Sequence, residues 1–230
     1  MTPVDLALFD LDHTLLDGDS DSLWGRFLVR QGVLDHDEYR RANAHYHAQY
    51  LSGGLDIHEF LAFGLSPLTQ HPLETLLAWR ARFVEECILP CIPAASRELL
   101  ARHAAHTRII ITATNSFVTT PIAAALGVPH LIATEPEQVD GRYTGRVTGV
   151  PCFREGKVKK LDAWLQERQL TAGETWFYSD SHNDLPLLER VTHPTAVNPD
   201  ETLTRVARER GWQMMSLKLP PAAGALSKSA

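Results

Sequence analysis

The sequence has little cysteine: three residues, Cys87, Cys91 and Cys152, among 230. Three thiols so far apart cannot build the disulfide framework of a small secreted protein, and they favour a reducing, cytoplasmic location. Cys87 and Cys91 lie one helical turn apart, as half of a zinc site would. Because two more Cys or His ligands would be needed, we expect buried thiols and no zinc.

The sequence also lacks an excess of positive charge. Lys and Arg together number 22 against 28 Asp and Glu, which gives a formal net charge of −6. Non-specific binding to a polyanion needs a basic surface. We therefore do not expect nucleic acid as a partner.

Long hydrophobic runs are missing as well. No stretch approaches the roughly 18 consecutive apolar residues of a membrane span. The first ten residues contain acids where a secretory signal has a basic and then an apolar segment. We expect no membrane partner. The 44% hydrophobic and 22% charged residues are ordinary globular values, and the length allows one large domain with a smaller appendage.

Short apolar runs alternate with helical patterns along much of the chain. This alternation predicts an α/β fold, with a Rossmann-like three-layer core around a mainly parallel sheet. The predicted strands are 4–9, 107–112, 130–134, 175–179 and 195–198. The predicted helices between them are 94–105, 156–168 and 201–210.

Two insertions interrupt this pattern. A crossover between parallel strands needs about a dozen residues, yet far more separate the first two strands. Their pattern is helical with Gly or Pro at each end, so we predict an all-helical cap of about four helices at 17–90, inserted into a core of 1–16 and 91–218. Asp140-Gly141 predicts a β-hairpin flap within the core at 135–152.

The end of the chain has a different composition. Residues 219–230 are rich in Pro, Ala, Gly and Ser. This composition predicts a flexible tail.

Asp10 and Asp12 follow the first predicted strand in the pattern D-x-D-x-T. Alternate residues of an extended segment face the same side, so both carboxylates can reach one point. One carboxylate can attack phosphorus while a second, protonated one gives a proton to the leaving oxygen. A strand end whose Asp and Thr cap the next turn would explain the same residues without chemistry.

Further polar residues are expected at the same edge of the sheet. Thr112 and Ala113 stand between a strand and a helix start, where hydroxyls and free N–H groups suit a phosphate. Lys157 stands near a helix start, where the helix dipole disfavours a cation; an exposed charge is the alternative. Asp180 and Asp184 follow another predicted strand, where two interpretations are open: metal ligands or helix caps. Ligands of open α/β sheets bind at this edge.

The ordered set of motifs resembles the haloacid dehalogenase superfamily of phosphotransferases. The motifs are FDLDHTL at 9–15, IIIT at 109–112, Lys157 in EGKV, and SDSHNDLPLL at 179–188. The resemblance covers about residues 4–213. Members with a helical cap after the first motif, including phosphoserine phosphatase, look most similar, because NDLP in the last motif matches their form of it.

The resemblance implies a role for each motif residue. Asp10 would be the nucleophile, and Asp12 the general acid and then the base that activates water. The residues that would bind the transferring phosphoryl group are Thr112, Ala113, Lys157 and Asn183.

The resemblance also implies Mg²⁺ as cofactor. Asp10, the backbone carbonyl of Asp12, and Asp180 would hold the ion, with Asp184 acting on it directly or through water. Mg²⁺ is preferred over Zn²⁺ because every ligand offered is a hard oxygen. Carboxylates about 4 Å apart repel each other by roughly 4 kcal/mol at an effective dielectric constant near 20, so the acids need cations.

Asp12 also bears on the reaction class. Dehalogenases of the superfamily lack an acid at that position, whereas an alcohol that leaves a phosphate ester needs a proton. We therefore expect a Mg²⁺-dependent phosphatase that hydrolyses a small-molecule phosphate monoester through an aspartyl phosphate. The alternatives are a phosphotransferase, a receiver-like phospho-accepting switch, which a helical cap argues against, and a binding protein without turnover.

The substrate is less clear from the sequence. Asp19 stands where phosphoserine phosphatases carry an acid that meets the substrate amine, but it also fits as the N-cap of a helix. Those enzymes hold the substrate carboxylate with a cap arginine, and residues 51–63 contain none. His182 suits either a solvent-facing turn or a contact with substrate. We expect a small phosphorylated metabolite as partner and either a monomer or a homodimer.

Overall fold

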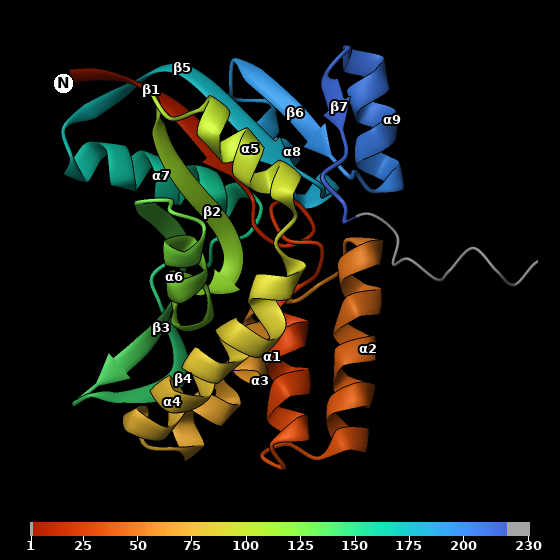
Figure 1. Ribbon diagram of the computed structural model, residues 1–230, viewed down its shortest axis with the longest axis vertical. Coiled ribbons are helices and arrows are strands. Elements are labelled where there is room, and N and C mark those ends of the chain that lie inside the picture. The colour runs from red at the N-terminus through yellow and green to blue at the C-terminus, as the bar shows by residue number, and fades with distance from the viewer. Residues whose placement is uncertain (1, 220–230) are drawn as a thin grey trace, which may run out of the picture.

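The computed structural model describes residues 2–219 of the protein (Figure 1). Apart from Leu219, the tail predicted at 219–230 lies outside these residues. The strands form one seven-stranded sheet in the order β4-β3-β2-β1-β5-β6-β7. Their bounds are β1 Thr2–Phe9, β2 Thr107–Asn115, β3 His130–Val139, β4 Arg142–Thr148, β5 Leu170–Ser179, β6 His193–Val197 and β7 Gln213–Met215.

The sheet is mainly parallel, as predicted. β1 lies at its centre, with Leu8 in register with Ile109 of β2 and with Phe177 of β5. Only the pairing of β3 with β4 is antiparallel among the described strands. The core strands are those that the apolar runs predict, but β7 was not predicted, because its three residues form no apolar run.

Helices cover both faces of the sheet. On one face, strand residues such as Phe9 and Ile110 pack against α5 (Ala94–Arg102) and α6 (Ser116–Ala125). Their neighbours, such as Leu8 and Ile109, pack on the other face. The helices there are α7 (Glu155–Glu167), α8 (Leu185–Leu188) and α9 (Glu201–Arg210). The alternation of strand residues therefore produces the three-layer core that the sequence predicts.

Helices occupy most of the chain between β1 and β2. They are α1 (Ser20–Arg30), α2 (His36–Ser52), α3 (Ile57–Gln70) and α4 (Leu73–Phe83), followed by a π turn, Val84–Ile88, and a 3-10 turn, Leu89–Cys91. Aspartates at positions 19, 35 and 56 cap the first three helices by accepting backbone N–H hydrogen bonds. We call residues 20–91 the helical insertion. Its assignment as a separate cap domain stays a prediction.

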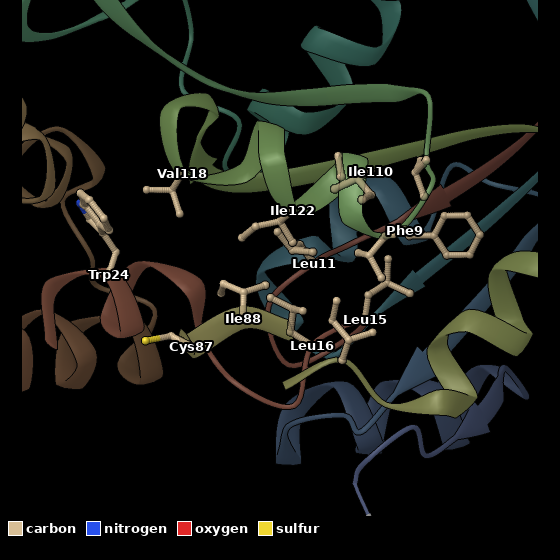
Figure 2. Packing of buried hydrophobic residues seen from close by; sticks show 14 of the residues in the cluster. Phe9, Leu11, Leu15, Leu16, Trp24, Cys87, Ile88, Ile110, Val118 and Ile122 are labelled. Atoms are coloured by element: carbon tan, nitrogen blue, oxygen red, sulfur yellow. The ribbon is translucent and has the colours of Figure 1, made fainter. Parts of the chain in front are cut away.

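The helical insertion shares a hydrophobic cluster with the core (Figure 2). The Trp24 ring of α1 lies 5.8 Å from the Phe117 ring of α6, edge to face. Val118 and Ile122 of α6 belong to the same cluster. The Asp17 N–H also donates to the Cys91 carbonyl at 2.8 Å, which joins the two connections of the insertion. Burial of this shared apolar surface fixes the insertion against the sheet edge.

β3 and β4 form the hairpin that Asp140-Gly141 predicts. Both turn residues have positive φ, +50° and +75°, as a two-residue hairpin turn with Asp-Gly at its centre requires. β4 approaches α3 so closely that a Cβ on Gly145 would lie 3.1 Å from Cγ2 of Thr69. The hairpin therefore lies against the helical insertion, while its role as a flap stays a prediction.

Candidate active site

The predicted site residues meet at the carboxyl ends of neighbouring strands. Asp10 directly follows β1, and Asp180 directly follows β5, the strand beside it. Thr112 lies near the end of β2, on the other side of β1. All three line one cavity of about 470 Å³. This is the sheet edge at which the sequence predicts a ligand.

Lys157 lies between two carboxylates. Its Nζ is 2.7 Å from Oδ1 of Asp10 and 2.7 Å from Oδ2 of Asp184. The residue is only 3% exposed, so the alternative of an exposed charge is wrong. Burial lowers the pKa of Lys157, but the two carboxylates outweigh that effect and raise the pKa above its usual value. The lysine therefore stays charged.

Gly156 allows α7 to bring Lys157 to this position. A Cβ on Gly156 would lie 2.0 Å from the Pro151 carbonyl oxygen, a distance that no side chain permits. Close approach of the backbone at the start of α7 therefore requires glycine here. The glycine of the EGKV motif is explained by this contact.

Asp12 is held by two hydrogen bonds. The Ser20 N–H donates to Oδ1 at 2.7 Å, and the Thr114 hydroxyl donates to Oδ2 at 2.8 Å. Burial, together with the charge of Asp19, raises the pKa of Asp12 to about 8. Asp12 is therefore largely protonated at neutral pH, which is the state that its predicted role as general acid needs. When Asp12 carries its proton, the Thr114 hydroxyl can accept instead of donating.

The sequence places Thr114 near the phosphate-binding residues but does not predict its hydrogen bond to Asp12. Thr114 stands two positions after Thr112 on the same strand, and alternate strand residues share a face. That spacing is the signal by which this contact could have been predicted.

Asp10 and Asp180 converge on Thr14. The Thr14 hydroxyl lies 3.4 Å from Oδ2 of Asp10 and 3.2 Å from Oδ1 of Asp180. Burial, followed by the charges of Asp10 and Asp184, raises the pKa of Asp180 well above its usual value. Buried carboxylates so close together repel each other unless a cation lies between them.

The donor set fits Mg²⁺ in its chemistry. Among the described residues, no group of three or more His, Cys, Asp or Glu side chains is arranged to hold a metal ion. The convergent carboxylates of Asp10 and Asp180 would need main-chain or water oxygens beside them, which Mg²⁺ commonly takes. Asp184 is bound instead to Lys157 and, at 2.6 Å, to the Ser179 hydroxyl.

The predicted phosphate-binding residues line the same cavity: Thr112, Ala113, Lys157 and Asn183. Thr112 is buried, and its Oγ1 accepts a hydrogen bond from the Thr114 N–H at 3.2 Å. Asn183 accepts a hydrogen bond from Nε of Arg154 at 2.8 Å. The structure brings these residues together, while their contact with phosphate stays a prediction.

The helical insertion supplies part of the cavity wall. Tyr46 and Tyr50 of α2 and Phe60 of α3 line it. The Tyr50 hydroxyl donates to Oγ of Ser181 at 2.8 Å, and Nη2 of Arg154 donates to the Gly53 carbonyl at 2.6 Å. Both contacts tie α2 to the core beside the last motif.

Asp19 and His182 also line the cavity. Asp19 is the N-cap of α1, because its Oδ1 accepts from the Ser22 N–H at 2.7 Å; contact with a substrate amine stays a prediction. His182 is partly buried and its Nδ1 lies 2.8 Å from Oδ2 of Asp200. His182 thus stands in a short turn and is held by Asp200, while its contact with substrate stays a prediction.

The family model for haloacid dehalogenase-like hydrolases matches residues 7–189. This chain belongs to that family. The matched segment contains all four motifs on which the resemblance was based. None of the helices among residues 2–219 has the length and apolar character needed to cross a bilayer.

Several relatives carry phosphatase names, among them the following two. A histidinol-phosphatase of Neisseria meningitidis serogroup C is 42% identical over 219 residues, which are 93% of this chain and 99% of that protein. A phosphoserine phosphatase of Mycobacterium tuberculosis is 30% identical over 225 residues, 94% of this chain and 73% of that protein. The expected class, a phosphoric monoester hydrolase, agrees with both names.

Solved structures show the same fold. A protein of unknown function from Bordetella pertussis Tohama I is 47% identical, with a TM-score of 0.88 over 94% of this chain and 100% of that one. A phosphoserine phosphatase, solved as a phospho-aspartyl intermediate analogue, has a TM-score of 0.66 at 18% identity, covering 94% of this chain and 95% of that one. This chain therefore shares its overall fold with both of these solved structures.

Proposed function

We propose that this protein hydrolyses a phosphate monoester of a small metabolite, with Mg²⁺, through an aspartyl phosphate on Asp10. The observation that carries the proposal is the pairing of Asp10, fixed by the Lys157 ammonium, with Asp12, whose raised pKa keeps a proton available. The cytoplasmic location is part of the proposal, supported by the three free thiols. The oligomeric state, monomer or homodimer, stays a prediction.

In the first step, the Asp10 carboxylate attacks phosphorus and the bond from phosphorus to the ester oxygen breaks. Asp12 gives its proton to that oxygen, so the alcohol leaves neutral. Thr114 and Ser20 hold Asp12 in place for this transfer. The charge of Lys157 stabilises the negative charge that gathers on the transferring phosphoryl group.

In the second step, Asp12 is a carboxylate and takes a proton from water. The resulting hydroxide oxygen bonds to phosphorus, the bond between phosphorus and Asp10 breaks, and inorganic phosphate leaves. Asp12 has then regained its proton. When bound, Mg²⁺ would be held by Asp10, the Asp12 main-chain carbonyl and Asp180, and would neutralise phosphate charge.

A phosphate-release assay tests the proposal. The substrates are phosphoserine, histidinol phosphate and sugar phosphates, each with Mg²⁺ and with EDTA. We expect release from at least one ester, its loss in EDTA, and a fall by several powers of ten in Asp10→Asn. Asp37→Asn is the control, because Asp37 is exposed on α2 away from the cavity. Turnover of Asp10→Asn within tenfold of wild type would contradict the role of Asp10.

A further inference from the structure

One part of the cavity wall is acidic. Asp19 and Asp21, at the start of α1, both line it, beside Ser22 and Asn43. Asp19 already uses one oxygen to cap α1. The two carboxylates belong to the helical insertion and not to the four motifs. A role for them in recognising the alcohol rests on the proposed function, because the alcohol is part of the same substrate.

The Asp21 carboxylate has no partner within the described chain. Unlike Asp19, it accepts no side-chain or backbone hydrogen bond there, and it joins no ion pair there. Its oxygens lie close to α3, since a Cβ built on Gly64 would be 3.6 Å from Oδ2. Burial, together with the charge of Asp19, raises the pKa of Asp21 to about 7. Asp21 is only partly buried, and an unpartnered carboxylate in such a position gains stability from a cationic ligand.

The same cavity offers almost no fixed positive charge. Among the described residues that line it, Lys157 is the sole Lys or Arg, and its Nζ is already paired with Asp10 and Asp184. Nearby Arg154 donates to Gly53 and Asn183. Of the histidines that line it, His182 is already paired with Asp200. A carboxylate or second phosphate on the alcohol would therefore face acids without a free cation.

One further part of the wall is apolar and aromatic. The rings of Tyr46 and Phe60 lie 5.6 Å apart at 70° to each other, and Leu55 and Ile57 continue the surface. Such a wall suits a flat or apolar group.

We infer that the alcohol of the substrate carries an ammonium group and a flat ring but no carboxylate, and that Asp21 selects the ammonium group. Asp21 is thus a specificity-determining residue outside the family motifs. A phosphorylated amino alcohol with an aromatic side chain has this chemistry. Phosphoserine, which carries a carboxylate, does not.

Three esters test this inference: histidinol phosphate, the same ester without its amine (imidazole-propanol phosphate), and phosphoserine. For wild type, we expect kcat/KM to be at least about tenfold higher for histidinol phosphate than for either other ester. Asp21→Asn, which keeps the shape, should lower the ratio between the first two esters by about tenfold, mainly through KM. Asp21→Glu should retain part of the preference. Asp37→Asn, on the exposed side of α2, should keep the wild-type ratio.

Two kinetic outcomes would overturn the inference: an unchanged ratio in Asp21→Asn, or phosphoserine used as well as histidinol phosphate. A binding measurement separates this failure from failure of the proposed function. Titration calorimetry of the first two esters with Asp10→Asn reports recognition of the amine without turnover. Two results would reject the role of Asp21. One is equal binding of both esters by Asp10→Asn, and the other is a preference for the amine-bearing ester that survives in the double variant Asp10→Asn, Asp21→Asn. Absence of phosphate release by wild type from every ester would instead reject the hydrolase proposal.

Discussion

The Lys157 ammonium group bridges Asp10 and Asp184, at 2.7 Å from an oxygen of each. Asp10 directly follows the central strand and Lys157 lies in the first turn of α7, so the ion pair joins two layers of the core at the candidate site. Both partners are buried, and the attraction is therefore weakly screened by water. The same contact has a structural role, because it balances charge, and a proposed catalytic role, because it holds Asp10 in place.

Lys157→Met should lower both stability and activity. Removing one partner of a buried ion pair leaves the other charge uncompensated, which costs about 3–5 kcal/mol. We expect a loss of this size in the free energy of unfolding by urea, and at least a hundredfold lower kcat. Lys159→Met is the matched control, because Lys159 lies on the same helix outside the ion pair. Stability and kcat equal to those of the control would show that the bridge contributes neither effect.

Thr114→Val should lower kcat with little change in KM. The substitution keeps the side-chain shape but removes the hydroxyl that donates to Asp12 at 2.8 Å. Asp12 then loses one of the two contacts that fix it for proton transfer, which we expect to reduce kcat by about tenfold to a hundredfold. Steady-state kinetics on the best ester measures the change. Thr120→Val, on the exposed side of α6, is the control. A rise in KM alone would assign Thr114 to substrate binding instead.

The sequence alone predicts the location of those site residues that directly follow a single apolar strand. Asp10 and Asp180 each directly follow an apolar strand, and parallel strands bring such ends together. Lys157 needed the resemblance as well, since its position near a helix start also suits an exposed charge. The contact of Thr114 with Asp12 could have been found by strand alternation.

The contacts of Tyr50 and Arg154 could not be predicted from the sequence. Tyr50 meets Ser181 across 131 residues, and Arg154 meets Gly53 across 101. Both contacts depend on how the helical insertion packs against the core. That packing comes from the shared cluster around Trp24 and Phe117, whose apolar residues show no partner in the sequence.

Tyr50→Phe should raise KM several-fold and leave the melting temperature nearly unchanged. The variant keeps the ring that faces Phe153 but loses the hydrogen bond to Ser181, so α2 is held less firmly over the cavity. Arg154→Gln should raise KM more than Tyr50→Phe does, because Arg154 contacts both Gly53 and Asn183. Arg146→Gln, in an exposed pair on the hairpin, is the control. KM values equal to that of wild type would mean that these contacts do not affect substrate binding.

Stability should depend on pH through His103. This histidine is buried at the end of α5, with Nε2 2.8 Å from the Tyr178 hydroxyl and Nδ1 2.8 Å from Nδ1 of His106. Burial, followed by the positive charges of His106 and Arg102, lowers the pKa of His103 to about 4. The pKa in the unfolded chain is about 6.5, so as pH falls the unfolded chain binds the proton first.

The contribution of His103 to stability is therefore fully present above about pH 6.5 and is lost as pH falls toward about 4. Urea unfolding at several pH values between these limits should show a free energy of unfolding that decreases with falling pH. In His103→Gln, the decrease in the free energy of unfolding should be smaller, because glutamine does not titrate. Loss of the hydrogen bond to Tyr178 would lower the stability of this variant at neutral pH but would not add to the slope with pH. His36→Gln is the control, because His36 is exposed at the start of α2. A slope with pH in His103→Gln as steep as in the control would mean that another group is responsible for the acid sensitivity.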